Sequence, residues 1–138
     1  MHGFEVNWLA VAAAAVAKFA IGGVWFSPVA FGPAWRAALG VPGPEMDAAM
    51  KARFVRCMIV DFIAGLAMAW VLANCLRFMG AVGLVPGVRT AFFLWLGFVA
   101  TVLLSTAMYE GKRLALFGIT GAYYLVAMLA MGGIIGVW

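Results

Sequence analysis

The sequence predicts an all-α fold, an integral membrane four-helix transmembrane bundle that forms a single domain over residues 1–138. Hydrophobic residues make up 67% of the chain, charged residues only 10%, and the mean hydropathy is +1.10, which excludes a water-soluble fold. Four apolar stretches each reach the ~20 residues that a helix needs to cross a hydrocarbon core. Aromatic residues stand near the ends of these stretches, where their amphipathic rings anchor a helix at the membrane surface.

The four stretches cover about residues 6–26, 54–78, 90–109 and 114–137. Each is almost continuously apolar and lacks the alternation of a barrel strand, so each is expected to be a helix. Ser27-Pro28 ends the first helix, because proline cannot continue the backbone hydrogen bonding. No lysine or arginine precedes Lys18, whereas a cleaved signal peptide begins with a basic segment. The first stretch is therefore expected to be retained as a span.

The connection between the first two spans, residues 27–53, is the longest. Its side chains Phe31, Trp35 and Leu39 favour a segment that lies on the membrane surface. Basic residues number six in the first and third connections and two in the second: Arg36, Lys51, Arg53, Arg56, Lys112 and Arg113 against Arg77 and Arg89. Because basic connections stay in the cytoplasm, the sequence predicts a multi-pass protein of the bacterial inner membrane with both termini on the non-cytoplasmic side.

Charge and cysteine usage limit the partners and cofactors. The net charge of +4 does not indicate nucleic-acid binding, because the basic residues flank apolar stretches instead of forming one polar face. Cys57 and Cys75 lie 18 positions apart in one predicted helix, about 27 Å along its axis, so no disulfide is expected. The only histidine is His2, so no metal, haem or other cofactor is expected either. The lipid bilayer is the partner that the composition requires.

Two ionisable residues, Lys18 and Asp61, stand inside predicted spans, where an unpaired charge costs at least ~2.5 to 3.5 kcal/mol. Lys18 lies eight positions before Phe26, and Asp61 lies seven positions after Phe54. Both charges are therefore about 10 to 12 Å from the cytoplasmic ends of their helices. Each also belongs to a stripe of small residues that repeats every four positions, which favours a place between helices. We predict an ion pair between them.

Polar residues of the third and fourth spans are expected at a similar depth. Counting from the cytoplasmic ends places Thr101, Ser105, Tyr123 and Tyr124 near the pair. The sequence thus predicts a polar layer in the cytoplasmic half of the bundle, with these side chains as a substrate or ion path. Two alternatives remain: a purely structural pair that fixes helix register, or a Lys18 side chain that reaches toward the interface.

Glycines on the small-residue stripes are candidates for close helix packing. They are Gly65, Gly97, Gly132 and Gly136. The spacing of the last two fits either a face for self-association or packing within one bundle. The sequence leaves both readings open.

Several stretches resemble a known family. They are Asn7-Trp8-Leu9-Ala10, Gly23-Val24-Trp25-Phe26-Ser27-Pro28, Phe31-Gly32 with Trp35, Gly121-Ala122-Tyr123-Tyr124-Leu125 and Gly132-Gly133-Ile134-Ile135-Gly136-Val137-Trp138. In these stretches the chain is similar to the bacterial DUF1761 family of unknown function, over nearly its whole length. The tryptophan-aromatic-Ser-Pro junction is the most specific part. The resemblance implies a four-helix membrane protein with no assigned activity, so it supplies no catalytic residue.

Three classes of function fit these observations. The polar layer favours a small-solute or ion transporter or exporter, in which Asp61 carries a proton or cation and Lys18 is the counter-charge. Four short helices enclose little volume, so a homo-oligomer is expected to complete the path. An accessory or assembly subunit of an unidentified membrane complex is the alternative. A lipid-modifying enzyme that uses Tyr124 and Asp61 ranks last, because no nucleophile with a nearby base is visible, and no enzymatic activity is expected.

Overall fold

The computed structural model describes residues 6–27, 30, 33–34, 48–111 and 114–138. Its helices are α1 (Trp8–Trp25), α3 (Ala48–Phe78), α4 (Leu84–Leu94), the π-helical segment η1 (Trp95–Ala100), α5 (Thr101–Tyr109) and α6 (Leu114–Val137). The segments α4, η1 and α5 follow one another directly and form one span, Leu84–Tyr109. Four helices are thus long and apolar enough to cross a membrane, and the described residues contain no strand. This confirms the predicted fold class.

The first helix begins and ends where its sequence provides partners for the terminal backbone groups. The Asn7 side-chain oxygen accepts hydrogen bonds from the backbone N–H groups of Leu9 and Ala10, at 3.0 and 3.2 Å, and so caps the start of α1. At the other end, the Ser27 hydroxyl donates to the carbonyl of Val24 at 2.6 Å. The predicted surface segment that follows, residues 27–53, lies largely outside the described residues and stays a prediction.

The third span begins at Leu84, earlier than the Thr90 expected from the sequence. The turn before it contains two glycines with positive φ angles, Gly80 at 65° and Gly83 at 104°, which side chains other than glycine rarely adopt. Pro86 then falls in the first turn of α4, where its missing N–H removes no bond within the helix. Glycines and a proline in succession indicated a longer connection, whereas they form a tight turn and a helix start.

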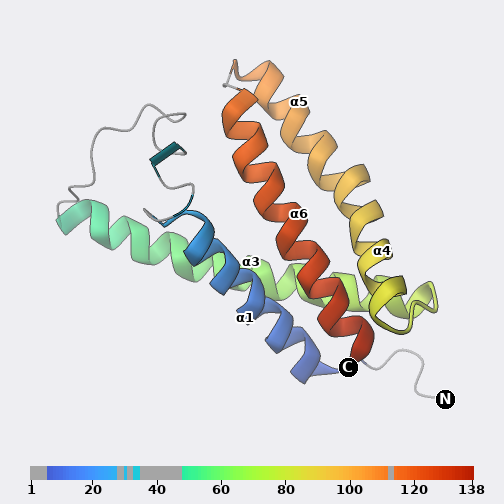
Figure 1. The fold of residues 1–138 in the computed structure, drawn as a ribbon. Helices are drawn as coiled ribbons and strands as arrows, with labels where there is room; N and C mark the ends of the chain where they lie inside the picture. Colours follow the sequence, from blue (N-terminus) through green and yellow to red (C-terminus); the bar gives the residue numbers. More distant parts are fainter. Residues whose placement is uncertain (1–5, 28–29, 31–32, 35–47, 112–113) are drawn as a thin grey trace.

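Helix α6 lies between α1 and α4, and α1 also packs against α3 (Figure 1). The buried core therefore collects where the start of α1 meets the second half of α3 and the ends of α4 and α6. Its members are apolar and mostly small: Val11, Ala14, Ala69, Leu72, Ala73, Leu76, Ala91, Met128 and Met131. Small side chains let these helices approach closely.

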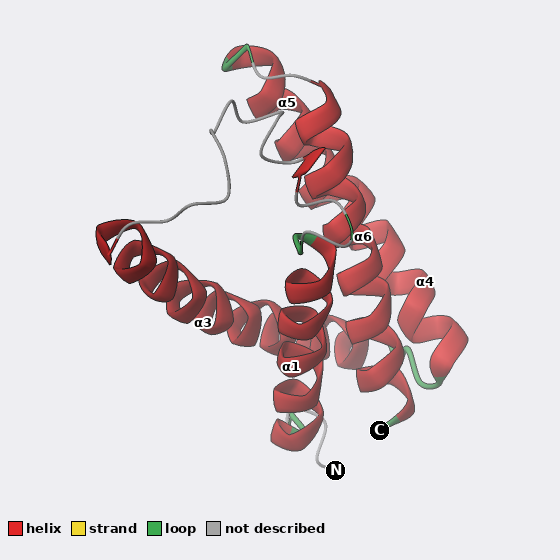
Figure 2. Ribbon diagram, turned by 60° about the vertical axis from the view of Figure 1, so that its left-hand side comes forward, coloured by secondary structure: helices red, strands yellow, loops and turns green. Residues whose placement is uncertain are grey.

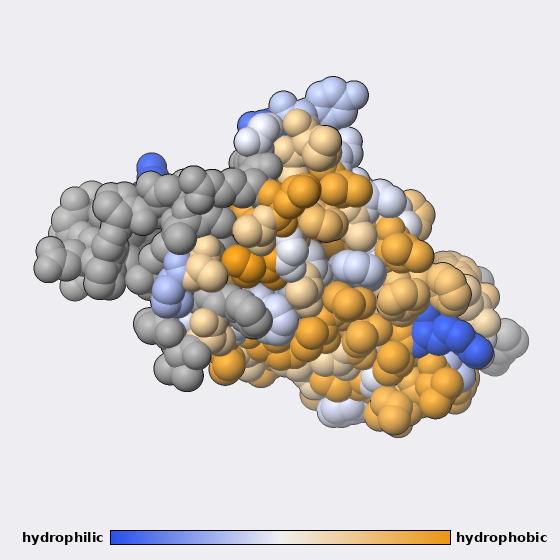
Figure 3. Space-filling view, turned by 45° about the horizontal axis from the view of Figure 1, so that its top comes forward, coloured by the Kyte–Doolittle hydropathy of each residue, from blue (hydrophilic) through white to orange (hydrophobic). Residues whose placement is uncertain are grey.

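The first half of α3 separates from the other helices, as Figure 2 shows. All described side chains from Ala52 to Val60 are exposed, whereas Ala69, Leu72 and Leu76 further along the helix are buried. On the face that Figure 3 shows, the described surface is largely apolar, and all four spans carry exposed large hydrophobic side chains. Within an apolar 18-residue stretch of each span, 28% of the residues are buried inside the chain in the first, second and fourth spans, and 11% in the third span. Such helices need lipid around them, and the chain is a polytopic membrane protein.

Candidate functional site

Lys18 and Asp61 form the predicted ion pair between α1 and α3. The Lys18 Nζ donates a hydrogen bond to Asp61 Oδ1 at 3.3 Å, which confirms the pairing expected from their matched depth. The Lys18 side chain crosses α3 at Gly65, where an added Cβ would lie 3.4 Å from its Cδ. Gly65, which the sequence predicted as a packing position, therefore provides the space through which the lysine reaches the carboxylate.

Two tyrosines of α6 complete the surroundings of the lysine. Its Nζ lies 5.5 Å from the ring centroid of Tyr123 and 5.6 Å from that of Tyr124, within the range of cation–π attraction. The Tyr123 hydroxyl also donates to the Lys18 carbonyl at 3.4 Å, in a gap that Gly22 leaves open. The structure thus brings four of the six predicted path residues together: Lys18, Asp61, Tyr123 and Tyr124.

The two charges of the pair differ in exposure. The Lys18 side chain is 3% exposed, whereas that of Asp61 is 46% exposed. Asp61 stands at the edge of an open groove along the first half of α3, where that helix separates from α1. The other lining residues are Arg53, Arg56, Cys57, Val60 and Ala64. The ammonium is therefore sealed inside the bundle, and the carboxylate is accessible from outside it.

Thr101 and Ser105 do not join this cluster. Both side chains are exposed, and the Thr101 hydroxyl donates to the Gly97 carbonyl of the preceding turn at 2.7 Å. The third span packs on α6, on the side away from α1 and from the first half of α3, so the equal depth expected from the sequence does not bring these residues to the pair (Figure 2). The predicted polar layer consequently includes α1, α3 and α6 only.

The third span turns a different face inward from the one expected. Gly87, Ala91 and Ala100 are buried, and the Trp95 indole N–H donates to the Gly121 carbonyl of α6 at 3.0 Å. Trp95 and Ala100, which both face α6 or the interior, are five residues apart. This spacing matches the wider turn of the π-helical segment η1, in which backbone groups five residues apart are paired. Gly97, predicted as a packing position, is exposed and would meet no atom within 4 Å if it carried a Cβ.

The comparison with known families adds one finding. A family model described as "Protein of unknown function (DUF1761)" matches residues 9–136, which include all of the four spans except Trp8 and Val137. The chain belongs to the DUF1761 family. No curated protein and no solved structure matches it. Since the family carries no assigned activity, function has to be argued from the arrangement of the residues in this DUF1761 chain.

In this DUF1761 protein the helix-packing glycines Gly132 and Gly136 face α4 within the same chain. A Cβ on Gly132 would lie 2.5 Å from the Gly87 carbonyl oxygen, and one on Gly136 would collide with the carbonyl of Gly83. The two helices are further joined by a hydrogen bond from the Gly83 N–H to the Gly136 carbonyl at 2.7 Å. The sequence left two interpretations open, a face for self-association and packing within one bundle. The structure shows packing within one bundle.

The facing glycines Gly83 and Gly87 were missed as packing residues. They have the same four-residue spacing as Gly132 and Gly136, and this spacing is the sequence pattern that could have identified them as packing residues. The predicted helix start at Thr90 had placed both in a connection, where glycine indicates a turn instead.

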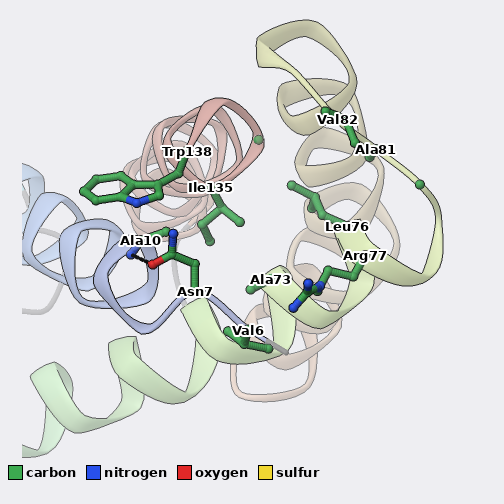
Figure 4. Close-up of a pocket in the computed structure, with 12 residues that line it drawn as sticks. Val6, Asn7, Ala10, Ala73, Leu76, Arg77, Ala81, Val82, Ile135 and Trp138 are labelled. Atoms are coloured by element: carbon green, nitrogen blue, oxygen red, sulfur yellow. Dashed lines mark hydrogen bonds between the residues drawn. The ribbon is translucent and has the colours of Figure 1, made fainter. Parts of the chain in front are cut away.

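A second hollow lies at the opposite end of the bundle, between the start of α1 and the ends of α3 and α6 (Figure 4). It measures about 580 Å³ and has mostly apolar walls, to which Ala10, Leu76 and Ile135 contribute. Asn7 and Arg77 bring polar groups to it. In the sequence, Asn7 stood out only as part of a stretch that resembles the family, and Arg77 only as a topology signal. Among the described residues no group of three or more His, Cys, Asp or Glu is placed to hold a metal ion.

Proposed function

We propose that this protein is a small-solute or ion transporter or exporter that acts as a homo-oligomer through the Lys18–Asp61 pair. One observation carries the proposal: a buried ammonium is paired with a carboxylate that is 46% exposed, inside a membrane-spanning bundle. Ionisable residues in spans are costly, and they mark substrate or proton paths in membrane proteins. The proposal assigns no catalytic reaction to the chain.

In this proposal the accessible partner, Asp61, exchanges a proton or a cation, and the sealed partner, Lys18, remains charged. When a proton or cation occupies the carboxylate, the attraction between the pair weakens, and the ammonium needs other support. The rings of Tyr123 and Tyr124, at 5.5 and 5.6 Å, supply part of it through cation–π attraction. This support lowers the cost of releasing the carboxylate, which repeated exchange requires.

A second copy of the chain completes the proposed path. The groove beside Asp61 has one wall, formed by Arg53, Arg56, Cys57, Val60 and Ala64 of α3, and is open on the other side. A path that excludes lipid needs a wall on both sides, because an ion in hydrocarbon loses its hydration. The glycine stripe of α6 is occupied by α4, so association through the free half of α3 is the arrangement that the proposal uses.

Flux through proteoliposomes tests the transport proposal directly. Vesicles with an internal pH-sensitive dye receive an imposed H⁺, Na⁺ or K⁺ gradient, and protein-dependent flux is expected for one of these ions. The double variant Lys18→Met/Asp61→Asn removes the carboxylate without leaving the lysine unpaired, and it is expected to abolish that flux. Thr101→Val, on the far side of α6, is the matched control and should retain it. Undiminished flux in the double variant would refute the role of the pair, and no flux in the wild type would refute ion transport.

An accessory or assembly subunit is the second candidate. The exposed apolar side chains Val55, Ile59 and Ile63 on the separated half of α3 favour it, because a larger membrane subunit could cover them. Under this alternative the wild-type protein carries no flux and purifies from its native membrane with a second subunit in fixed ratio. The variant Ile59→Ser/Ile63→Ser would then release that second subunit. A transporter built only from copies of this chain has no different subunit to lose.

The proposed orientation puts both termini on the non-cytoplasmic side of the bacterial inner membrane, following the excess of basic residues in the first and third connections. Single-cysteine variants in a chain without Cys57 and Cys75 test it. An impermeant thiol reagent added to intact cells is expected to label Val85→Cys and spare Pro42→Cys. The opposite labelling pattern would reverse the orientation.

A further inference from the structure

The open groove on α3 combines charges of both signs at a surface that faces away from the other helices. Its lining residues recur every three or four positions and so occupy one face of the helix: Arg53, Arg56, Cys57, Val60, Asp61 and Ala64. The two arginines are at the end where the span begins, and both are exposed. Asp61 lies six positions after Val55, the first residue of the span, and is therefore about 9 Å further into the membrane along the axis.

The exposed part of Asp61 needs a second cation from outside the bundle. Lys18 donates to one carboxylate oxygen, Oδ1, at 3.3 Å, whereas a carboxylate accepts several hydrogen bonds through two oxygens. At this depth the side that faces away from Lys18 meets lipid instead of bulk water, and an incompletely paired carboxylate is unfavourable there. A small cationic group with N–H donors that enters from the lipid side would complete its hydrogen bonding.

Arg53 and Arg56 supply the complementary element. Guanidinium groups bind phosphate through paired hydrogen bonds, and these two reach from the membrane surface toward the same groove. Arg56 and Asp61 are five positions apart, about 7.5 Å along the helix axis. That separation, bridged by long side chains, suits a ligand whose phosphate and ammonium are a few bonds apart. A ligand with both a phosphate and an ammonium matches the arginines and Asp61 together, whereas a purely cationic or purely anionic ligand matches only one of them.

We infer that this groove binds the headgroup of an aminophospholipid, with the phosphate at Arg53 and Arg56 and the primary ammonium at Asp61. A lipid fits better than a soluble zwitterion because Cys57, Val60 and Ala64 form an apolar floor and the groove opens toward the bilayer. The lipid's acyl chains lie along the exposed apolar side chains of α3, such as Ile63. A lipid and a second copy of the chain are alternative occupants of this groove, so the inference rests neither on the proposed oligomer nor on transport: a bound lipid would complete the pair in a protein that moves nothing.

Titration of the purified protein in detergent with single lipids, followed by native mass spectrometry, tests this site. Phosphatidylethanolamine has phosphate and a primary ammonium, phosphatidylcholine has no N–H donor on its ammonium, and phosphatidylglycerol has no cation. Phosphatidylethanolamine is expected to bind about tenfold more tightly than either, the scale of one charge-assisted hydrogen bond. The variant Arg53→Gln/Arg56→Gln is expected to weaken binding of all three lipids by about tenfold.

Two further variants distinguish the contribution of Asp61 from that of the arginines. Lys18→Met/Asp61→Asn keeps the interior free of an unpaired lysine and is expected to abolish only the preference for phosphatidylethanolamine. Arg89→Gln removes an exposed arginine of α4, far from the groove, and should leave all three affinities unchanged. Equal affinity of the wild type for the three lipids, tighter binding of phosphatidylglycerol, or no effect of the double arginine variant would overturn the inference.

Discussion

Helix α6 contacts its two neighbouring regions in different ways. Toward α4 the contact is made by glycines on both sides, with backbone against backbone and a direct hydrogen bond from Gly83 to Gly136 at 2.7 Å. Toward α1 and α3 it is made by tyrosine rings and a charged pair, in which Lys18 and Asp61 are 3.3 Å apart. Beyond that pair, α3 leaves the bundle (Figure 2).

The difference separates a fixed contact from an adjustable one. Touching backbones tolerate almost no displacement, because dense packing resists even one extra methyl group. Long side chains that meet through charge and ring faces keep their attraction over a wider range of positions. The α4–α6 contact therefore suits a rigid part of the bundle. The α1–α3 contact suits a site at which a bound proton or cation can exchange. The following substitutions test this division.

The largest loss is expected from the double variant Gly132→Ile/Gly136→Ile. Each isoleucine would force a branched side chain into the α4 backbone, and each overpacked site costs ~1 to 3 kcal/mol or more. We expect loss of the folded, monodisperse protein, measured by size-exclusion chromatography and thermal unfolding in detergent. An intact but smaller particle would contradict this reading, because it would show that the glycines join two copies.

The next largest effect is expected for Asp61→Leu, which leaves the buried Lys18 ammonium unpaired. Breaking a buried pair costs ~3 to 5 kcal/mol. Lys18→Met should cost less, because the Asp61 carboxylate is 46% exposed and retains other partners. The combined variant should recover much of the loss, since no charge is left alone. Thermal unfolding of the three variants measures this order, and simply additive losses would show that the pair does not stabilise the fold.

A smaller effect is expected for Tyr123→Phe. This change removes the hydroxyl that donates to the Lys18 carbonyl but keeps the ring beside the ammonium. A hydrogen bond contributes ~0.5 to 1.5 kcal/mol, and at 3.4 Å this one should lie at the lower end. Tyr124→Phe is the matched control, and a shift in melting temperature restricted to Tyr123→Phe is the expected result. A large loss would assign the hydroxyl a partner beyond the Lys18 carbonyl.

The common level of Lys18 and Asp61 was predictable from the sequence, whereas the direction of each helix face was predictable only in part. For Lys18 and Asp61, the matched depth and the small-residue stripes both indicated a contact between helices, and the two side chains meet at 3.3 Å. Thr101 and Ser105 had the same depth, but depth says nothing about rotation around the helix axis. The stripe that they share with Gly97 faces outward because the glycine face of α4 packs on α6 instead.

The site itself was only half predictable for a related reason. The charges and tyrosines are rare in apolar spans, so they stood out from the sequence. The unequal exposure of Lys18 and Asp61 depends on the separation of α3 from α1, a tertiary property that no local pattern records. The groove with Arg53 and Arg56 follows from the same separation, because those arginines were read as topology signals alone.

The smallest effect is expected for Gly97→Ala, and its sign is opposite to that of Gly132→Ala. Alanine favours a helix over glycine by up to ~1 kcal/mol, and at Gly97 the new methyl group meets no atom within 4 Å. We therefore expect unchanged or slightly raised thermal stability. At Gly132 the same methyl group would lie 2.5 Å from the Gly87 carbonyl oxygen and 2.7 Å from the Ala91 Cβ, so overpacking outweighs propensity. Equal losses at the two positions would refute the division between a packed and a free face, because they would place the exposed face of the third span against a second copy of the chain.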